Sequence, residues 1–255
     1  MVLSHRSFLN LGGDVRLDQA LVSRGLARSR QHASELIRAG KVMVDGVAAT
    51  KPSHAVDDAA SLDAPVDRYV GRAAHKLLGA LEDSGTSVAG RVLDAGASTG
   101  GFTQVLLERG ADRVYAVDVG HGQLVESLRT DPRVAVHEGV NLRDLTLALL
   151  EDQPLDLVVA DVSFISLQLL LAPMLGVLRG DGVALLMVKP QFEVGRERLG
   201  PGGVVRRPQD RTTAVDGVAQ AASDLGWAED WRGESRLPGP AGNVEYFLRL
   251  RRRGH

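Results

Sequence analysis

Residues 92–110 read VLDAGASTGGFTQVLLERG, and this stretch decides the fold of the larger part of the chain. Its start completes an apolar strand segment at 91–95, its middle is a glycine-rich turn, and its end is a helical segment. Further apolar strand segments follow at 113–118, 133–137, 155–160 and 182–188. Helical stretches lie between them, notably at 165–178. Strands that alternate with helices predict an α/β fold with a doubly wound, parallel sheet.

The segment NVEYFLRLRR, residues 243–252, has a different pattern, because its residues alternate between two faces. One face has Val244, Tyr246, Leu248 and Leu250, and the other has Glu245, Phe247, Arg249 and Arg251. Such alternation is typical of an antiparallel strand with one buried face. We therefore expect the last strand to join a mostly parallel sheet in the antiparallel direction.

Charge is distributed unevenly along the 255 residues, whose formal net charge is −2. Residues 1–56 contain eight Lys and Arg against four acids, whereas 57–67 contain four Asp and no base. A local basic surface, rather than the total charge, is the electrostatic mark of nucleic-acid binding. The change in composition predicts four parts, which are an N-terminal extension at 1–14, a small domain at 15–62, a linker at 63–71 and a larger domain at 72–255.

The small domain has the pattern of two helices followed by a hairpin. Its apolar positions at helical spacing are Leu17, Ala20 and Leu21, then Ala33, Leu36 and Ile37. Gly25 and Gly40 stand where the helices should end. The pair Asp45-Gly46 between two short apolar runs is the strongest short-range hairpin signal. The pattern predicts a small α+β unit.

Cationic side chains gather around the turn between these helices and continue beyond it. They are Arg16, Arg24, Arg28, Arg30, Arg38 and Lys41, and Arg72 follows the linker. Composition alone leaves two interpretations open, a solvated surface or an RNA-binding face. The run RLDQALVSRGLARSRQHASELIRAGKVMVDG resembles RNA-binding domains of the ribosomal protein S4 type, with Asp45 in place of their asparagine. The resemblance implies docking on structured RNA through shape and phosphate contacts.

A cofactor is expected at the carboxyl ends of the strands, where ligands of doubly wound sheets bind. Gly96 and Gly100 permit close backbone approach to a ligand, and Asp118 is placed to bind a ribose diol. NAD, S-adenosylmethionine (SAM) and an ordinary turn without cofactor are the three interpretations. The turn lacks the G-x-G-x-x-G pattern of pyrophosphate binding. It begins with Asp94, which repels a pyrophosphate but suits an ammonium and a sulfonium, so the sequence favours SAM.

The residues and motifs that the sequence lacks exclude several classes of methyl acceptor. The absence of cysteine excludes disulfides, thiolate metal sites and the covalent route to carbon-5 methylation of pyrimidines. The fourth strand ends in VVADVSFISL, without the Asn-Pro-Pro-Tyr or Asp-Pro-Pro-Tyr of exocyclic amine methylation. An alcohol remains, and the hydroxyl abundant in RNA is the ribose 2′-hydroxyl. No ligand cluster calls for zinc or magnesium.

A ribose hydroxyl needs help with deprotonation, which a lysine amine among carboxylates can give. Asp161 and Lys189 end parallel strands at the rim of the glycine turn, Glu245 begins the last strand there, and Lys76 lies just before the first strand. Each has an ordinary interpretation too: a surface residue for Lys76 and Glu245, a helix cap for Asp161 and a solvent-reaching strand end for Lys189. Together they form the predicted catalytic set, in which either lysine can accept the proton.

The order of Lys76, Asp161, Lys189 and Glu245 resembles the K-D-K-E tetrad of FtsJ-like ribose 2′-O-methyltransferases. The motifs RYVGRAAHKL, LDAGASTGGFT, AVDVG, VADVSFISL, LMVKPQFEVG and NVEYFL are similar, in this order, to those of the TlyA family of rRNA cytidine 2′-O-methyltransferases, once labelled haemolysins. The resemblance covers about residues 14–251 and implies a Rossmann-like SAM methyltransferase sheet behind an S4-type domain. The cofactor contacts that it implies are Asp94, Gly96, Ser98, Gly100, Asp118, Asn141 and Asp161. Many relatives carry tryptophan near the place of Tyr69, which is a departure.

The arginine-rich stretch at 192–211 is expected to be a loop that either closes over RNA or simply lies on the surface. No apolar run approaches the roughly 20 residues that cross a bilayer, and the start has no signal-peptide pattern, so we expect a cytoplasmic protein. The expected partner is ribosomal RNA, without membrane or metal. Two rival functions are a non-catalytic RNA-binding ribosome assembly factor and a membrane-active haemolysin, although the amphipathic basic helix of the latter is missing.

Overall fold

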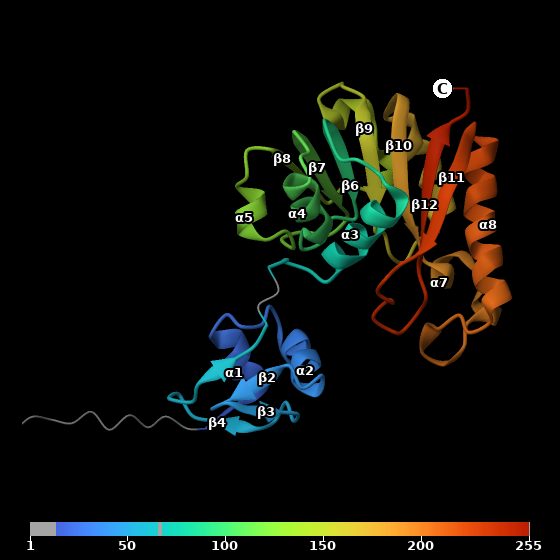
Figure 1. Cartoon of the computed structure of the whole chain (residues 1–255). Coiled ribbons are helices and arrows are strands. Elements are labelled where there is room, and N and C mark those ends of the chain that lie inside the picture. The colour runs from blue at the N-terminus through green and yellow to red at the C-terminus, as the bar shows by residue number, and fades with distance from the viewer. Residues whose placement is uncertain (1–13, 66–67, 255) are drawn as a thin grey trace, which may run out of the picture. The chain divides into compact units, whose positions relative to one another are not determined.

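The computed structural model describes residues 14–65 and 68–254. The chain divides into two compact units, 1–68 and 69–255 (Figure 1), and each has its own hydrophobic core. Residues 1–13 of the predicted N-terminal extension lie outside the described part, as do residues 66 and 67 of the predicted linker.

The described part of the first unit contains two helices and two small sheets. Its elements are β1 (Val15–Arg16), α1 (Leu17–Ser23), α2 (Arg30–Arg38), β2 (Val42–Val44), β3 (Val47–Ala49), β4 (Ala55–Val56) and β5 (Leu62–Asp63). The strand β1 pairs with β4, and the second sheet has the order β3-β2-β5. The α+β prediction is confirmed. Asp63, predicted as the first linker residue, is the last residue of β5.

The core of the first unit comes from the two predicted apolar stripes. Leu17, Leu21 and Ile37 are fully buried. The side chain of Ser29 accepts a hydrogen bond from the backbone N–H of His32 and so caps α2. Asp45, which stands in place of the asparagine of the S4 pattern, has a φ of 50°, and its side chain accepts a hydrogen bond from the Ser61 N–H.

The second unit is built on a seven-stranded sheet of order β11-β12-β10-β9-β6-β7-β8. The strands are β6 (Arg91–Ala95), β7 (Arg113–Asp118), β8 (Val134–Glu138), β9 (Leu155–Ala160), β10 (Leu178–Val188), β11 (Trp227–Glu234) and β12 (Tyr246–Arg252). The first five are parallel, whereas β12 runs antiparallel to both β10 and β11. The predicted mostly parallel sheet with an antiparallel last strand is confirmed.

Helices cover both faces of this sheet. They are α3 (Ala73–Ser84), α4 (Gly101–Glu108), α5 (Glu126–Arg129), α6 (Leu171–Gly176), α7 (Pro190–Glu193) and α8 (Pro208–Asp224). Residues of α3, α4 and α5 share one buried cluster, while residues of α6 and α8 share the other. Successive residues of a strand enter opposite clusters, as Val92 and Leu93 do in β6. The unit is therefore a three-layer α/β/α domain.

The last strand, β12, has one more neighbouring strand and one more buried face than predicted. It lies between β10 and β11 (Figure 1), and β11 was not among the predicted strands. The expectation of a single buried face is wrong, because Phe247 and Leu248, on opposite faces, are both fully buried. The Phe247 ring lies 6.4 Å from that of Phe102 on α4.

The arginine-rich segment at 192–211 has more structure than the expected loop. Two 3-10 turns, Arg196–Arg198 and Pro201–Gly203, precede α8, which begins at Pro208. The buried Asn243 holds the segment, because its Oδ1 accepts from the Val205 N–H and its Nδ2 donates to the Gly203 carbonyl.

Tyr69, the departure in the predicted linker, belongs to the second unit. Its side chain is buried, its hydroxyl donates a hydrogen bond to Glu108 at 3.1 Å, and its ring meets that of His75 edge to face. A tyrosine here thus anchors the start of the second unit to α4.

Candidate active site

A cavity of about 560 Å³ opens at the carboxyl ends of the parallel strands. It lies where the topology of doubly wound sheets places ligands, beside β6, where the strand order reverses. Five of the seven predicted cofactor residues line it, namely Gly96, Ser98, Asp118, Asn141 and Asp161. Asp94 and Gly100 are not among the lining residues.

Asp118 is held by the backbone at the end of β7. Its two carboxylate oxygens accept hydrogen bonds from the Ser98 N–H at 2.8 Å and the Gly120 N–H at 2.7 Å. Each oxygen keeps a lone pair for a further donor such as a ribose hydroxyl. Gly96 lets the glycine turn pack closely against the backbone after β9, since a Cβ at Gly96 would lie 2.9 Å from the Asp161 carbonyl oxygen.

Asp94 lies beneath the cavity and is completely buried. Thr103 donates a hydrogen bond to its Oδ2 at 2.6 Å, while its Oδ1 has no hydrogen-bond partner within the described part of the chain. Burial raises the pKa of Asp94 to about 7, and the nearby Asp161 and Asp118 carboxylates act in the same direction. Of these three acids, Asp118 and Asp161 line the cavity, and their carboxylates favour a cationic ligand.

The raised pKa of Asp94 predicts a pH-dependent stability. Between pH 4 and 7 the folded protein keeps a proton that the unfolded chain has lost, so stability falls as pH rises through this window. Compared with Asp94→Asn, the wild type is expected to lose roughly 2 kcal/mol more of its unfolding free energy between pH 5 and 7.5. Urea denaturation at both pH values measures this, and parallel losses in the two proteins would contradict it.

Gly100 closes the glycine turn instead of lining the cavity. Its φ is 99°, and it immediately precedes α4. A Cβ at this position would lie 2.3 Å from Leu128 Cδ1, so only glycine fits here without displacing that side chain.

The predicted catalytic residues lie in two lysine–carboxylate pairs. Lys76 Nζ, from α3, lies 2.5 Å from Glu245 Oε2 just before β12, and both side chains are at least 95% buried. Lys189 Nζ, at the end of β10, lies 2.6 Å from Asp161 Oδ1 at the end of β9. Lys76 Nζ also lies 4.0 Å from the sulfur of Met187, two residues before Lys189. The structure therefore brings four residues that are distant in sequence to one end of the sheet.

Further residues that the sequence analysis did not assign complete this arrangement. Lys189 donates to the hydroxyl of Ser163 at 2.7 Å, and Gln191 Nε2 donates to Glu245 at 3.3 Å. Glu193 accepts hydrogen bonds from the Ser166 hydroxyl and the Leu167 N–H, each at 2.7 Å. All five lie in the motifs VADVSFISL and LMVKPQFEVG, so their closeness in sequence to Asp161 and Lys189 was the available signal.

An aromatic side chain projects from the cavity wall. Phe164 lines the cavity yet is 92% exposed, and its φ of 65° is unusual for a residue other than glycine. Its ring lies 5.3 Å from that of Phe192 on α7. A solvent-facing ring held in this way offers a flat surface on which an unpaired base can stack.

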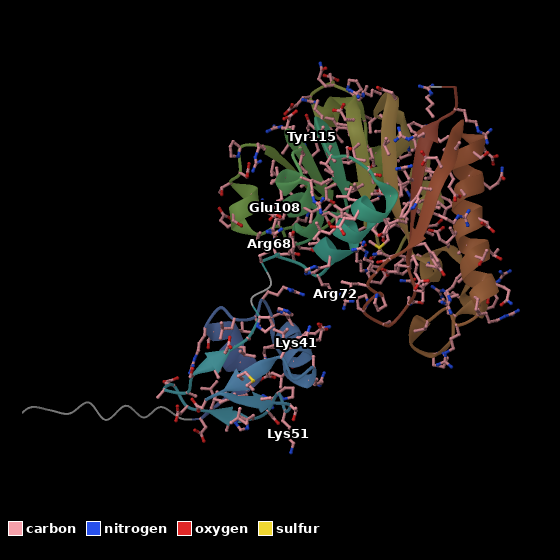
Figure 2. All side chains as sticks on the ribbon, viewed as in Figure 1. Lys41, Lys51, Arg68, Arg72, Glu108 and Tyr115 are labelled. Carbon is pink, nitrogen blue, oxygen red and sulfur yellow. The ribbon has the colours of Figure 1, made fainter. Side chains whose placement is uncertain are left out.

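The predicted RNA-binding cations differ in how they are used. Arg24 donates to the carbonyl groups of Asp57, Asp58 and Ala60, so it ties together the first unit. Arg16 and Arg30 both pair with the buried Asp18, and Arg28 lies 3.4 Å from the ring of His32. Arg72 donates to the Pro238 carbonyl at 2.6 Å in the second unit (Figure 2).

Arg38 and Lys41 are exposed, and neither makes an ion pair or side-chain hydrogen bond within residues 14–65 and 68–254 (Figure 2 labels Lys41). Within the same ranges, no helix is long and apolar enough to cross a membrane. The described residues also contain no group of three or more acidic or histidine side chains arranged to hold a metal ion.

A three-layer α/β/α domain, an acid-lined cavity at the carboxyl ends of its strands and the lysine–carboxylate pairs together define a Rossmann-like methyltransferase. Family comparison agrees, since the FtsJ-like methyltransferase model matches residues 69–252 and the S4 domain model matches residues 15–60. The chain therefore belongs to the FtsJ-like methyltransferase family and carries an N-terminal S4 domain.

Similar proteins share both parts of the chain. The 16S/23S rRNA (cytidine-2′-O)-methyltransferase TlyA of Mycobacterium tuberculosis is 56% identical over 240 residues, which cover 92% of this chain and 89% of the relative. Hemolysin A of Brachyspira hyodysenteriae is 38% identical and covers 91% of this chain and 98% of its own. The solved structure of a putative hemolysin from Streptococcus thermophilus is 37% identical, with a TM-score of 0.75, over 94% of this chain and 89% of that one.

Proposed function

We propose that this protein transfers a methyl group from SAM to the ribose 2′-hydroxyl of a cytidine in ribosomal RNA. The observation that carries the proposal is the pair of lysine–carboxylate contacts beside the acid-lined cavity. A ribose hydroxyl needs a positioned base, and an amine oriented by a carboxylate is the base that these residues offer. The relative from M. tuberculosis bears the name of the same reaction.

The cavity suits SAM by the chemistry of its groups. The carboxylates of Asp118 and Asp161 line the cavity, where they favour a ligand with an ammonium and a sulfonium and disfavour a pyrophosphate. Asp118 would accept hydrogen bonds from the ribose of the cofactor, while Gly96 and Asn141 would line its surroundings. When bound, SAM supplies an electrophilic methyl group.

The four catalytic residues divide the work in this proposal. Lys189 is paired with Asp161, which lines the cavity and orients the amine, and Lys189 either holds the acceptor oxygen or takes its proton. Lys76 and Glu245 are more deeply buried, and they fix the neighbouring strand ends and balance the charge. Proton removal and alignment of the hydroxyl with the methyl group are then performed by side chains held in place before substrate binds.

The S4 unit would dock on folded ribosomal RNA through phosphate contacts, and such a partner implies action in the cytoplasm. The double variant Arg38→Ala/Lys41→Ala is expected to bind ribosomal RNA roughly tenfold more weakly and to reduce the salt dependence of binding, because two free cations are lost. Filter binding at several salt concentrations, with the folding of the variant checked by circular dichroism, measures this.

Arg24→Ala provides the contrast, because Arg24 is engaged with three carbonyl groups of its own unit. This variant should lower the unfolding temperature of the first unit. A normal unfolding temperature combined with the largest loss of RNA affinity would instead identify Arg24 as a phosphate contact.

The proposed function is tested by mapping 2′-O-methyl groups on ribosomal RNA, which resist alkaline cleavage. Ribosomal subunits from cells that lack this protein are incubated with the purified protein and SAM. One or two newly protected cytidines are expected. RNA retention without any protected position would favour the assembly-factor alternative.

A further inference from the structure

The loop after β9 places a hydroxyl group between Lys189 and the cavity. Ser163 lines the cavity and is exposed, whereas only 10% of the Lys189 side chain is exposed and Lys189 is not among the lining residues. The Lys189 ammonium nitrogen lies 2.7 Å from Ser163 Oγ and 2.6 Å from Asp161 Oδ1. A hydroxyl group that enters from the cavity therefore meets Ser163 and Asp161 before it meets the amine.

The position of Ser163 is fixed from both sides. At one end of the loop, the Asp161 N–H donates to the Ala95 carbonyl at 2.9 Å, which ties the loop to β6. At the other end, Glu193 on α7 accepts from the Ser166 hydroxyl and the Leu167 N–H. Because α7 directly follows Lys189, the same short helix orients the lysine and the loop that carries the serine.

We propose that Ser163 is a further catalytic residue, whose hydroxyl contacts the acceptor 2′-hydroxyl and passes its proton to Lys189. The inference rests on the proposed function, which supplies the acceptor. It assigns a role that the tetrad alone leaves open, because the buried amine then needs no direct contact with the ribose. The nearby Asp161 orients Lys189 toward Ser163.

The proton transfer balances without any further reagent. Before the transfer, the Lys189 ammonium releases one proton to the solvent, and its hydrogen bond with Ser163 reverses, so that the Ser163 hydroxyl donates to the amine. The 2′-hydroxyl then donates its proton to Ser163 Oγ while the Ser163 proton passes to the amine, which becomes an ammonium again. The ribose oxygen forms its bond to the methyl carbon as the carbon–sulfur bond breaks, and the electron pair of that bond stays on sulfur. The ammonium later returns its proton to the solvent.

The first test measures binding without cofactor. Synthetic RNA of the mapped site carries either cytidine or 2′-deoxycytidine at the target, and its affinity for the full chain is measured by fluorescence anisotropy. The wild type is expected to prefer cytidine about fivefold, the value of one hydrogen bond. Ser163→Ala should reduce this preference to less than twofold. A preference that Ser163→Ala leaves intact would overturn the proposal.

The second test separates the hydroxyl group from the shape of the loop. Ser163→Ala is expected to lower kcat about 10- to 100-fold, and Ser163→Thr, which keeps a hydroxyl, should recover kcat to within about threefold. Thr212→Ala removes an exposed hydroxyl of α8 that donates to the Pro208 carbonyl of the same helix, so its kcat should stay within about twofold of the wild type. A Ser163→Thr variant as slow as Ser163→Ala would reject the relay.

The methyltransferase activity and the role of Ser163 can be disproved separately. If the wild type protects no ribosomal cytidine, the proposed function is wrong and the role of Ser163 falls with it. If the wild type methylates ribosomal RNA and Ser163→Ala does so at an unchanged rate, only the relay is wrong.

Discussion

Replacement of Lys189 by methionine is expected to lower kcat for methyl transfer to ribosomal RNA by about 10³-fold, within the range of a lost general base. Methionine keeps most of the apolar stem of the lysine but removes the amine that reaches Asp161 and Ser163. Because the Asp161 carboxylate is partly exposed at the cavity, it remains solvated when its partner is lost, so the fold should survive. Tritium transfer from labelled SAM to ribosomal subunits gives the rate.

A slow Lys189→Met variant identifies Lys189 as the base only if this variant still binds SAM. Lys189 is not among the residues that line the cavity, so calorimetric titration should give an affinity close to that of the wild type. A variant that retains more than about a tenth of the wild-type rate would move the role of base to Lys76.

Removal of either member of the Lys76–Glu245 pair is expected to cost about 3–5 kcal/mol of unfolding free energy, because the remaining charge is buried without its partner. Both side chains are almost inaccessible, with 5% and 1% exposed, and within the described residues the other polar contact of Lys76 Nζ is the sulfur of Met187. Urea denaturation of Lys76→Met and of Glu245→Leu measures the two losses.

The double variant Lys76→Met/Glu245→Leu separates stability from catalysis. With both charges replaced by apolar side chains, most of the lost stability should return, since a buried ion pair often adds little over a well-packed apolar pair. Methyl transfer should nevertheless remain strongly impaired. A double variant with normal activity would assign the pair a purely structural role.

The parallel strands were predictable because each contains a short apolar run and helical stretches lie between them. β6, β7 and β9 have the predicted bounds of 91–95, 113–118 and 155–160. Once these strands are parallel, their carboxyl ends meet at one rim, and this brings Asp161 and Lys189 together. The closeness of Lys76 to Glu245 followed from the family resemblance, since a helix before the first strand has no fixed position in the pattern.

The edge of the sheet was missed because its stabilising contacts lie between strands. The strand β11, WAEDWRGE, contains four charged residues, and its Asp230 pairs with Arg249 and Arg251 on β12. Such cross-strand ion pairs leave no periodic apolar pattern in the sequence. The second buried face of β12 was also missed, because Leu248 and Phe247 are covered by the two helical layers rather than by a neighbouring strand.

The sequence pattern also did not predict which residues of the glycine turn line the cavity. A turn of the form DAGASTGG shows that the backbone approaches a ligand, but not which of its residues face the cavity. The packing of Leu128 and Leu124 against Gly100, and of Thr103 against Asp94, decides that both residues lie behind the wall. The contact of Thr103 comes from α4, directly after the turn, whereas those of Leu124 and Leu128 come from the segment around α5, more than 20 residues further along the chain.

The place of β12 in the sheet sets the order in which this protein becomes competent during synthesis. β10 and β11 both leave the ribosome before β12, yet each forms its antiparallel pairing only with β12. A nascent chain that has already formed the parallel strands still has a gap in its sheet, and it lacks Glu245 beside Lys76. The cavity can thus take shape early, whereas the catalytic set is assembled only when the final strand is inserted between its two neighbours.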